Sequence, residues 1–150
     1  MTMPAHPPTI LVVDDDPDCL DIATHLLERE GFRVRTANNG VDCLLVTTSE
    51  PVDLILLDVM MPGMDGFAVC SALRDSGRRI PVILLTARED IDARFEGIAQ
   101  GVVEYLTKPI NRHELVARVQ AQLHILELGR QLEAVERSLH ATRQDPRPTQ

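Results

Sequence analysis

Aromatic residues are scarce in this sequence. Its 150 residues include three phenylalanines, one tyrosine (Tyr105) and no tryptophan, which argues against a site that holds a flat ring between aromatic side chains. No apolar run approaches the roughly 18–20 residues that a membrane-spanning helix needs. Met1–Thr9 also lack the basic block followed by an apolar block that marks a secretory signal. We therefore expect neither a membrane protein nor a secreted one.

Cysteine and lysine are scarce as well. The cysteines are odd in number and lack metal-ligand spacing, which predicts reduced core thiols in a cytoplasmic protein; they are Cys19, Cys43 and Cys70. Among the 15 basic residues Lys108 is the single lysine, and the net charge is −8. Acids and arginines balance from Glu127 onward, so the excess of acids lies before it. This charge disfavours a nucleic-acid surface and suits a cation or a basic partner.

Short apolar segments alternate with longer segments of helical periodicity. The apolar segments are rich in valine, isoleucine and leucine; they are Ile10–Val13, Arg33–Thr36, Leu54–Leu57, Val82–Leu85 and Val102–Leu106. Several are apolar almost throughout, as are strands of a parallel sheet that is buried on both faces. The alternation predicts an α/β fold, namely a doubly wound parallel sheet of five strands.

Capping residues mark three helix starts. Asp16 stands before Pro17, a residue suited to a first helical turn, and Asp65 offers a similar cap. Asn111 is followed three residues later by Glu114, close to a capping box. Helical stretches are expected to end at glycines, which are Gly31, Gly77 and Gly101.

The last helical segment continues past the length that packing on a sheet requires. From about Asn111 onward, small or apolar residues recur at alternating intervals of four and three; they are Ala121, Ile125, Leu128, Leu132, Val135, Leu139 and Thr142. This spacing is typical of a coiled-coil seam, although Gly129 weakens the helix by about 1 kcal/mol relative to alanine. Two interpretations stay open, a single frayed helix and a short parallel coiled coil. On the second, we expect a homodimer through this C-terminal helix.

Polar side chains stand where the predicted strands end. They are Asp14, Asp15, Asp16, Asp58, Thr86 and Lys108. The carboxyl ends of parallel strands meet at one edge, where ligands of open α/β sheets bind. Clustered carboxylates need a neutralising cation, and oxygen ligands favour Mg²⁺ or Mn²⁺. An ammonium suits a phosphate, and an aspartate can be the nucleophile that becomes an aspartyl phosphate. The set predicts phosphoryl transfer, which needs positioning and charge neutralisation most.

Four segments carry a specific resemblance. They are Ile10–Pro17 (ILVVDDDP), Leu54–Gly66 (LILLDVMMPGMDG), Pro81–Ala87 (PVILLTA) and Tyr105–Pro109 (YLTKP). Together, over about residues 9–126, they resemble the receiver domain of bacterial two-component response regulators. The resemblance implies a flavodoxin-like sheet of strand order 2-1-3-4-5. It also implies a cytoplasmic phosphoprotein of a phosphorelay, a switch and not an enzyme, that receives its phosphoryl group from a sensor histidine kinase or a phosphotransfer protein.

The resemblance also implies which residues bind the metal and the phosphoryl group. Asp58 would be the phosphoacceptor. Asp15 and Asp58 would ligate Mg²⁺ (or Mn²⁺) directly, together with the backbone carbonyl of Met60. Asp14 would ligate the same ion through a water molecule.

Three further residues take roles in the implied switch. Lys108 would pair with Asp58 before transfer and with the phosphoryl group after it, and its bond to Pro109 is expected to be cis. Thr86 would hydrogen-bond a phosphoryl oxygen and move toward it. Tyr105 would then swing into the space that Thr86 leaves. Such a switch is a local electrostatic event that biases a bistable element.

Some positions depart from the commonest family pattern. The segment Gly101–Glu104 reads GVVE where the family often has Gly-Ala-Asp-Asp. Because this segment lies outside the chemistry, we expect it to alter an output surface and not phosphorylation. Met60 and Arg88 stand at variable positions beside the pocket. Their bulk and charge are expected to hinder an attacking water and to lengthen the life of the phosphoryl group.

Three other functions were weighed against the receiver. A haloacid-dehalogenase-type aspartyl phosphatase would want a second aspartate two residues after Asp58, where Met60 stands. A pseudo-receiver, which binds its partners without phosphorylation, is disfavoured by the complete acidic set. A flavin-binding flavodoxin-like protein would need a phosphate loop rich in serine, threonine and glycine, and more aromatic residues.

The expected organisation has three parts. Residues 1–8 are expected to be disordered, residues 9–126 to form the receiver domain, and residues 127–150 to form a helical extension with a disordered end. The 24 residues after Leu126 are too few for a DNA-binding domain, so we expect no direct nucleic-acid binding by this chain. Two interpretations stay open, a fragment of a larger regulator and a stand-alone relay.

Overall fold

The structure is a computed structural model, and it describes residues 7–87 and 102–144. The described residues form five strands and four helices, which are β1 (Thr9–Val13), α1 (Pro17–Arg29), β2 (Arg33–Ala37), α2 (Gly40–Ser49), β3 (Leu54–Asp58), α3 (Gly66–Asp75), β4 (Val82–Thr86), β5 (Glu104–Thr107) and α5 (Arg112–Gln144). The expected alternation of strands and helices is confirmed in these ranges, and the helix expected between β4 and β5 lies outside the described residues. Gly101 and Arg88 lie outside the described residues.

The five strands form one parallel sheet in the order β2-β1-β3-β4-β5. Both the parallel sheet and the order that the family resemblance implied are therefore confirmed. β1 lies between β2 and β3, with Ile10 beside Leu54 and Val13 beside Leu57. All carboxyl ends consequently point to one edge of the sheet, which we call the carboxyl edge.

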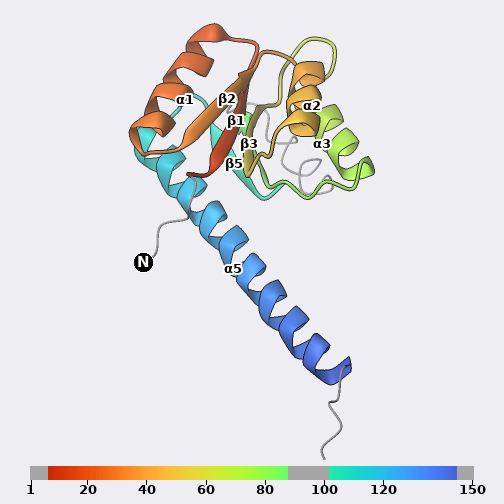
Figure 1. The fold of residues 1–150 in the computed structure, drawn as a ribbon. Helices are drawn as coiled ribbons and strands as arrows, with labels where there is room; N and C mark the ends of the chain where they lie inside the picture. The colour runs from red at the N-terminus through yellow and green to blue at the C-terminus, as the bar shows by residue number, and fades with distance from the viewer. Residues whose placement is uncertain (1–6, 88–101, 145–150) are drawn as a thin grey trace, which may run out of the picture.

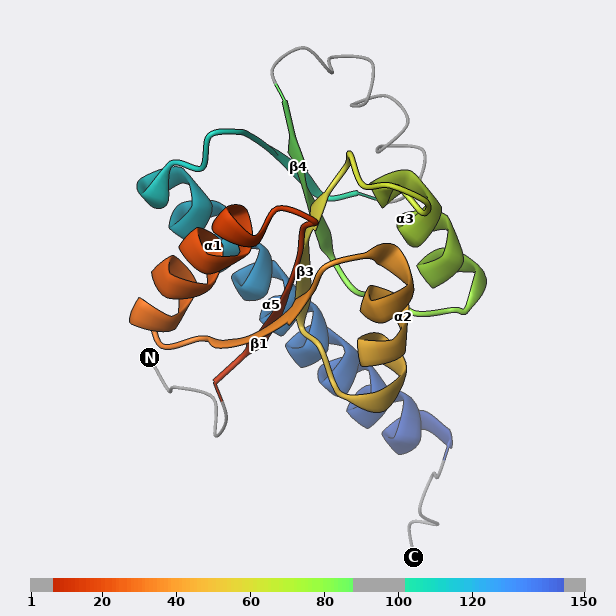
Figure 2. The same cartoon turned by 90° about the horizontal axis from the view of Figure 1, so that it is seen from above.

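The helices cover both faces of the sheet. α1 and the first part of α5 lie on one face, and α2 and α3 lie on the other (Figure 1 and Figure 2). The alternation of side chains along a strand serves both faces. In β1, Ile10 and Val12 pack with Leu115 of α5, whereas Leu11 and Val13 pack in the cluster beneath α2 and α3. Double-sided burial is thus the reason for the apolar runs.

Strand bounds differ slightly from the predicted ones. The largest shift is at β5, which begins at Glu104 where the apolar run predicted Val102. The central strands β3 and β4 are buried at every position, whereas Arg33, Arg35 and Thr36 of β2 are exposed. β2 is an edge strand, which explains its weaker hydrophobic signal.

The predicted helix caps are confirmed. The side chain of Asp16 accepts a hydrogen bond from the amide of Asp18 at 3.0 Å, and that of Asp65 accepts one from Ala68 at 2.9 Å. The side chain of Asn111 accepts one from the amide of Glu114 at 3.1 Å. The prediction that helices end at glycines is confirmed at Gly31 (φ 91°) and Gly77 (φ 79°), which have the left-handed backbone expected there. An additional cap that was not predicted is Asn39, at the start of α2.

The helix α5 continues far beyond the sheet. Leu115 and Val119 are fully buried in its first part, and the helix then leaves the body of the molecule (Figure 1). We call residues 127–144 the extension. The extended C-terminal helix is confirmed. Within residues 7–87 and 102–144, no helix is both long enough and apolar enough to cross a membrane.

The cysteines only partly match the expectation. All three are free, and Cys43 and Cys70 are buried as predicted. Cys19 of α1 is half-buried, so the prediction of a core thiol is wrong for it. Its sulfur lies 3.4 Å from Oδ2 of the helix-capping Asp16, near the carboxyl edge and away from the core.

Candidate functional site

Three carboxylates gather at the carboxyl edge. Asp14, Asp15 and Asp58 each offer an oxygen, and these oxygens lie within 4.8 Å of one another. Asp14 is 0% exposed and Asp58 4% exposed, whereas Asp15 is exposed. The sequence prediction that β1 and β3 bring these acids together is therefore matched by the geometry.

Backbone hydrogen bonds hold the strand ends at this edge. The amide of Asp14 donates to the carbonyl of Ala37 on β2 at 3.2 Å. On the other side, the amide of Lys108 donates to the carbonyl of Thr86 at 2.9 Å. Because each strand end is tied to its neighbour, the side chains are positioned by the sheet and not by a free loop.

The ammonium of Lys108 lies between the two buried acids. Its Nζ is 2.9 Å from Oδ2 of Asp14 and 3.3 Å from Oδ1 of Asp58. Pairing with Asp58 was predicted, but the shorter contact with Asp14 was not. The peptide bond from Lys108 to Pro109 is cis, as the family resemblance implied. The sequence does not indicate which of the two acids lies nearer to Lys108, because both stand at the ends of buried strands.

The environment shifts the pKa of Asp58. Burial, followed by the neighbouring charge of Asp14, raises the pKa to about 6, against the opposing influence of Lys108. Burial acts to lower the pKa of Lys108, but its hydrogen bond to Asp14 and the charge of Asp58 outweigh that effect and raise it. The lysine therefore stays charged near neutral pH.

Thr86 and Tyr105 stand on adjacent strands near this edge. Thr86 is 5% exposed, and its hydroxyl donates to the carbonyl of Ala87 at 3.2 Å. Tyr105 is half-buried, pairs in register with Leu84, and packs against the cluster beneath α2 and α3. Thr86 thus lies at the end of β4, in register with Thr107, and Tyr105 lies two positions before the end of β5.

The loop after β3 brings two further groups to the site. The amide of Met60 donates to Oδ1 of Asp58 at 3.3 Å, and the Met60 side chain is 65% exposed. Gly66 follows the helix-capping Asp65 and is the first residue of α3. A Cβ atom at Gly66 would lie 2.7 Å from the carbonyl oxygen of Asp58, so only glycine lets α3 begin this close to the strand end. No signal in the spacing alone indicates that contact.

The donor set fits a small divalent cation. Carboxylate oxygens are ligands that Mg²⁺ and Mn²⁺ prefer, and three of them converge here. Asp15 is the exposed member, so solvent reaches the cluster on its side. Mg²⁺ keeps several water ligands in proteins, which suits such a partly open site.

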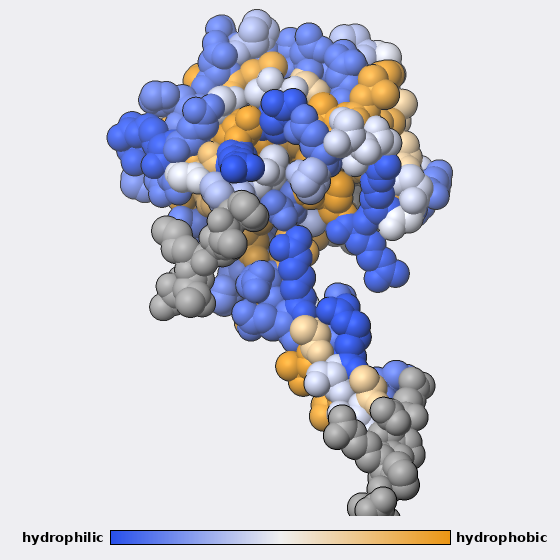
Figure 3. Space-filling model, viewed as in Figure 1, coloured by the Kyte–Doolittle hydropathy of each residue, from blue (hydrophilic) through white to orange (hydrophobic). Residues whose placement is uncertain are grey.

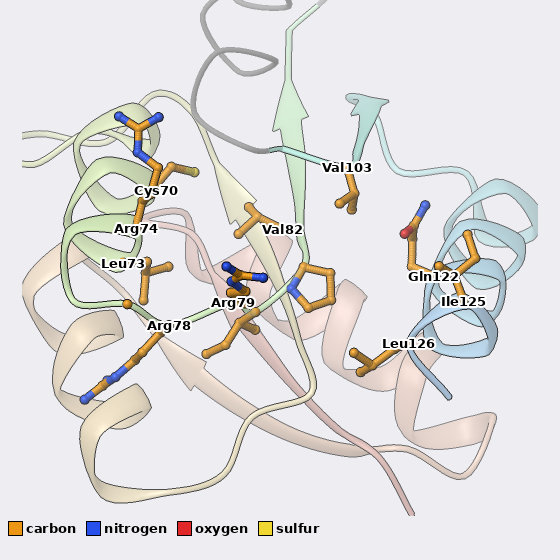
Figure 4. A pocket seen from close by; sticks show the side chains of 13 residues that line it. Cys70, Leu73, Arg74, Arg78, Arg79, Val82, Val103, Gln122, Ile125 and Leu126 are labelled. Carbon is orange, nitrogen blue, oxygen red and sulfur yellow. The ribbon is translucent and has the colours of Figure 1, made fainter. Parts of the chain in front are cut away.

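A groove elsewhere in the molecule lacks this chemistry. It has a volume of about 520 Å³ and lies between α3, the start of β4 and α5 (Figure 4). Leu73, Val82 and Leu126 line it together with Arg78 and other residues. Because Val82 is the first residue of β4, the groove lies at the edge opposite to the carboxylates. It therefore belongs to a different end of the molecule.

A family model matches most of the chain. Residues 10–120 match the model described as the response regulator receiver domain. The chain is 37% identical over 137 residues to response regulator MprA of Mycobacterium leprae (strain TN), a match that covers 91% of this chain and 60% of that protein. It is 41% identical over 114 residues to MprA of Mycobacterium avium (strain 104), covering 76% and 50% respectively. The chain thus spans 50–60% of the length of these curated relatives.

Solved structures share the fold. The receiver domain of the Francisella response regulator 1452 matches with a TM-score of 0.75 and 32% identity, covering 79% of this chain and 98% of that one. The chemotaxis protein CheY4 of Vibrio cholerae matches with a TM-score of 0.73 and 31% identity, covering 77% and 98%.

Proposed function

The chain belongs to the response regulator receiver domain family, whose members act in phosphorylation-dependent two-component signalling, and from this premise we propose that Asp58 is its phosphoacceptor. The observation that carries the proposal is the position of Asp58 at the end of β3. There it is held beside Asp14 and Asp15 and contacted by the ammonium of Lys108. Residues 9–126 form the proposed receiver domain, and residues 127–150 the proposed extension.

The proposed reaction is phosphoryl transfer from a phosphohistidine. A carboxylate oxygen of Asp58 attacks the phosphorus, a P–O bond forms, the P–N bond breaks, and the imidazole leaves with the electron pair. Lys108 neutralises charge on the phosphoryl oxygens, and the hydroxyl of Thr86 hydrogen-bonds one of them. The contacts of the Lys108 ammonium with Asp14 and Asp58, which hold it at the site, support this role.

Mg²⁺ or Mn²⁺ is the proposed cofactor. Asp15 and Asp58 would hold it directly with the carbonyl of Met60, and Asp14 would hold it through water. When bound, the ion neutralises charge on the acids and on the transferred group. Close spacing of the three carboxylates supports this set.

The proposed output is a conformational switch. Thr86 moves toward the phosphoryl group and Tyr105 swings inward, so this chain is a phosphoacceptor that assists only its own phosphorylation and dephosphorylation. Met60, with its exposed side chain at the pocket, would limit the approach of water. Arg88 is proposed to act in the same way, on sequence position alone.

The proposed partners are a phosphodonor protein and a second copy of this chain. The proposed donor is a sensor histidine kinase or a phosphotransfer protein, and the proposed setting is the cytoplasm. A second copy of this chain is proposed to bind through the C-terminal helix. Direct nucleic-acid binding by this chain is not part of the proposal, since the net charge of −8 disfavours it.

The test is phosphorylation by a small phosphodonor. The chain incubated with acetyl phosphate and Mg²⁺ should gain the mass of one phosphoryl group, and Asp58→Asn should gain none. A matched control is Asp21→Asn, which makes the same change at an exposed position of α1. Equal labelling of Asp58→Asn would refute the assignment.

Two outcomes would favour the alternatives. If the unchanged chain takes up no phosphoryl group from any donor and still binds a partner, a pseudo-receiver replaces the proposal. If it turns over a generic phosphomonoester such as p-nitrophenyl phosphate, a phosphatase of the haloacid-dehalogenase type replaces it.

A further inference from the structure

An exposed apolar stripe runs along α5. Each of its members is 50–60% exposed in the single chain; they are Ile125, Leu128, Leu132, Val135 and Leu139. We call these residues the seam. Figure 3 shows apolar surface on this part of the helix, below the body of the molecule. Contiguous apolar surface of this kind marks an interaction site in a globular protein.

The seam has the regularity of a coiled coil. Ile125, Leu132 and Leu139 recur every seven residues, and Leu128 and Val135 recur every seven between them. In heptad terms these are positions a and d, which pack against the same positions of a second helix. An output helix of another sequence would not need this self-matching repeat, so a second copy of the chain is the occupant that fits.

The residues that flank the seam are compatible with self-association. In a parallel pair, position g of one helix faces position e of the other one heptad on. Gln131 would face Glu136, and His124 would face Gly129. No pair sets like charges against each other, and Gln131 and Glu136 are a hydrogen-bond donor and an acceptor. Charged residues elsewhere on the extension lie away from the seam.

An ion pair fixes the direction in which the seam faces. Arg130, at position f, lies on the face of the helix opposite to the seam. Its Nη2 is 3.2 Å from Oδ1 of Asp53, while Oδ2 of Asp53 accepts a hydrogen bond from the amide of Thr9 at 2.8 Å. We call this group the Asp53 clasp. Because it holds the opposite face of the helix against the receiver, the seam from Leu128 onward points away from its own domain, whereas Ile125 also borders the groove beside β4.

The seam and the acidic pocket lie at opposite ends of the molecule. α5 begins at Arg112, soon after Lys108, and passes along the sheet (Figure 1). It reaches Asp53, which immediately precedes β3 and therefore lies at the amino edge. The extension continues beyond that edge for residues 131–144, a length of roughly 21 Å at 1.5 Å per residue. A second helix on the seam therefore leaves the carboxyl edge uncovered.

We propose that two copies of this chain pair in parallel along the seam, independently of phosphorylation, and leave both acidic pockets open to a phosphodonor. The parallel arrangement carries both far ends of the extension away from the receivers. An antiparallel one would bring the far end of each extension to the other receiver, beside the Asp53 clasp. The statement on the pockets depends on the proposed function of Asp58; the pairing itself does not.

Sedimentation of the whole chain tests the pairing. At tens of micromolar the unchanged chain should be a dimer, and Leu132→Asp should raise the dimer dissociation constant at least about 100-fold, because each dimer loses two buried leucines. Ala134→Asp is the matched control, since Ala134 is exposed but lies off the seam, and it should stay dimeric. A monomeric unchanged chain, or equal dissociation of the control, would overturn the pairing.

Cross-linking tests the orientation. In a Cys19→Ser background, Thr142→Cys places a thiol at position d near the far end of the helix. Oxidation with copper phenanthroline should link two copies there if they are parallel, whereas Ala134→Cys on the outer face should give no link. A dimer that fails to cross-link through Thr142→Cys would overturn the parallel arrangement.

Measuring phosphorylation and dimerisation in the same variants distinguishes the pairing of the seam from the assignment of Asp58 as phosphoacceptor. Asp58→Asn should block phosphorylation and remain dimeric, while Leu132→Asp should be monomeric and still accept a phosphoryl group. The dissociation constant should change by less than about threefold on addition of acetyl phosphate and Mg²⁺. A tightening of about tenfold or more would overturn the independence from phosphorylation.

Discussion

The carboxyl edge and the extension depart from the usual distribution of side chains in opposite ways. At the edge, charged groups are buried, with Asp14 0% and Asp58 4% exposed. On the extension, large apolar groups are exposed, with Leu132 at 60%. Acids are almost never fully buried unless they are paired, and clustered exposed leucines are uncommon in monomers.

The two regions differ in what compensates their unusual side chains. The buried acids are tolerated because Lys108 contacts both of them, and a bound divalent cation would add to that compensation. The seam has no such compensation within its own described chain. We propose that contact with a second copy of the chain covers it. Functional regions are expected to break local rules in this way, because their partners complete them.

The largest expected effect separates the two halves of α5. Leu115→Ala removes a fully buried side chain from the core and should lower the free energy of unfolding by about 2–5 kcal/mol. Leu132→Ala should change it by less than about 0.5 kcal/mol in the monomeric chain. Urea denaturation measures both, at a concentration where sedimentation finds monomers. Equal losses would mean that the extension belongs to the receiver core.

The next effect concerns the buried charges. Lys108→Met leaves Asp14 and Asp58 without their cation, and should lower the free energy of unfolding by roughly 2–4 kcal/mol at pH 7.5 in EDTA. Arg118→Met removes the more exposed pair with Glu104 and should cost at most about 1 kcal/mol. Mg²⁺ should recover part of the first loss and none of the second. Similar losses in both variants would contradict the role of Lys108 as the compensating charge.

A stabilising effect is expected at Asp58. Its pKa is raised to about 6 in the folded chain, so the folded state binds more protons than the unfolded state between about pH 4 and pH 6. The stability of the metal-free chain therefore falls as the pH rises through that window. Asp58→Asn should be more stable than the unchanged chain by about 1–3 kcal/mol at pH 7.5 in EDTA, and the difference should vanish below about pH 4.

The control for this pH effect is Asp21→Asn, an exposed acid on α1. Urea melts of the three chains at pH 4 and pH 7.5 give the comparison directly. A lower stability for Asp58→Asn at pH 7.5 would show that the charged form of Asp58 is favoured by the fold.

The smallest effect is at the Asp53 clasp. Arg130→Gln breaks an exposed ion pair and should cost less than about 0.5 kcal/mol of unfolding free energy. Asp53→Ala also removes the acceptor of the Thr9 amide, and should cost about 0.5–1.5 kcal/mol. Hydrogen exchange of the Thr9 amide should speed up only in Asp53→Ala. A faster exchange in Arg130→Gln would mean that the two contacts of Asp53 depend on each other.

Much of the fold was predictable because its signals are local. Asp16 and Asp65 cap helices through amides two and three residues away, so sequence spacing suffices to find them. The buried strands were found because double-sided burial demands an unbroken apolar run. At β5 the bounds were less accurate, since Glu104 begins the strand and its side chain is bound by Arg118 on α5, a contact that spacing does not indicate.

For the candidate site, strand ends were predictable and pair contacts were not. Asp14, Asp58 and Lys108 follow strands, and parallel strands bring their ends together. That Lys108 lies nearer to Asp14 than to Asp58 depends on side-chain packing at that edge. The need for glycine at Gly66 depends likewise on how closely α3 approaches Asp58.

The sequence by itself determined the strands, the capped helices, the acids at the strand ends and the heptad spacing of α5, because each depends on neighbours along the chain. Tertiary structure decided which charges are buried together and which way the seam faces. The raised pKa of Asp58 requires burial beside Asp14, 44 positions away. The direction of the seam requires Arg130 to contact Asp53, 77 positions away. Such contacts form only when the sheet and the helices pack, since no local preference brings those side chains together.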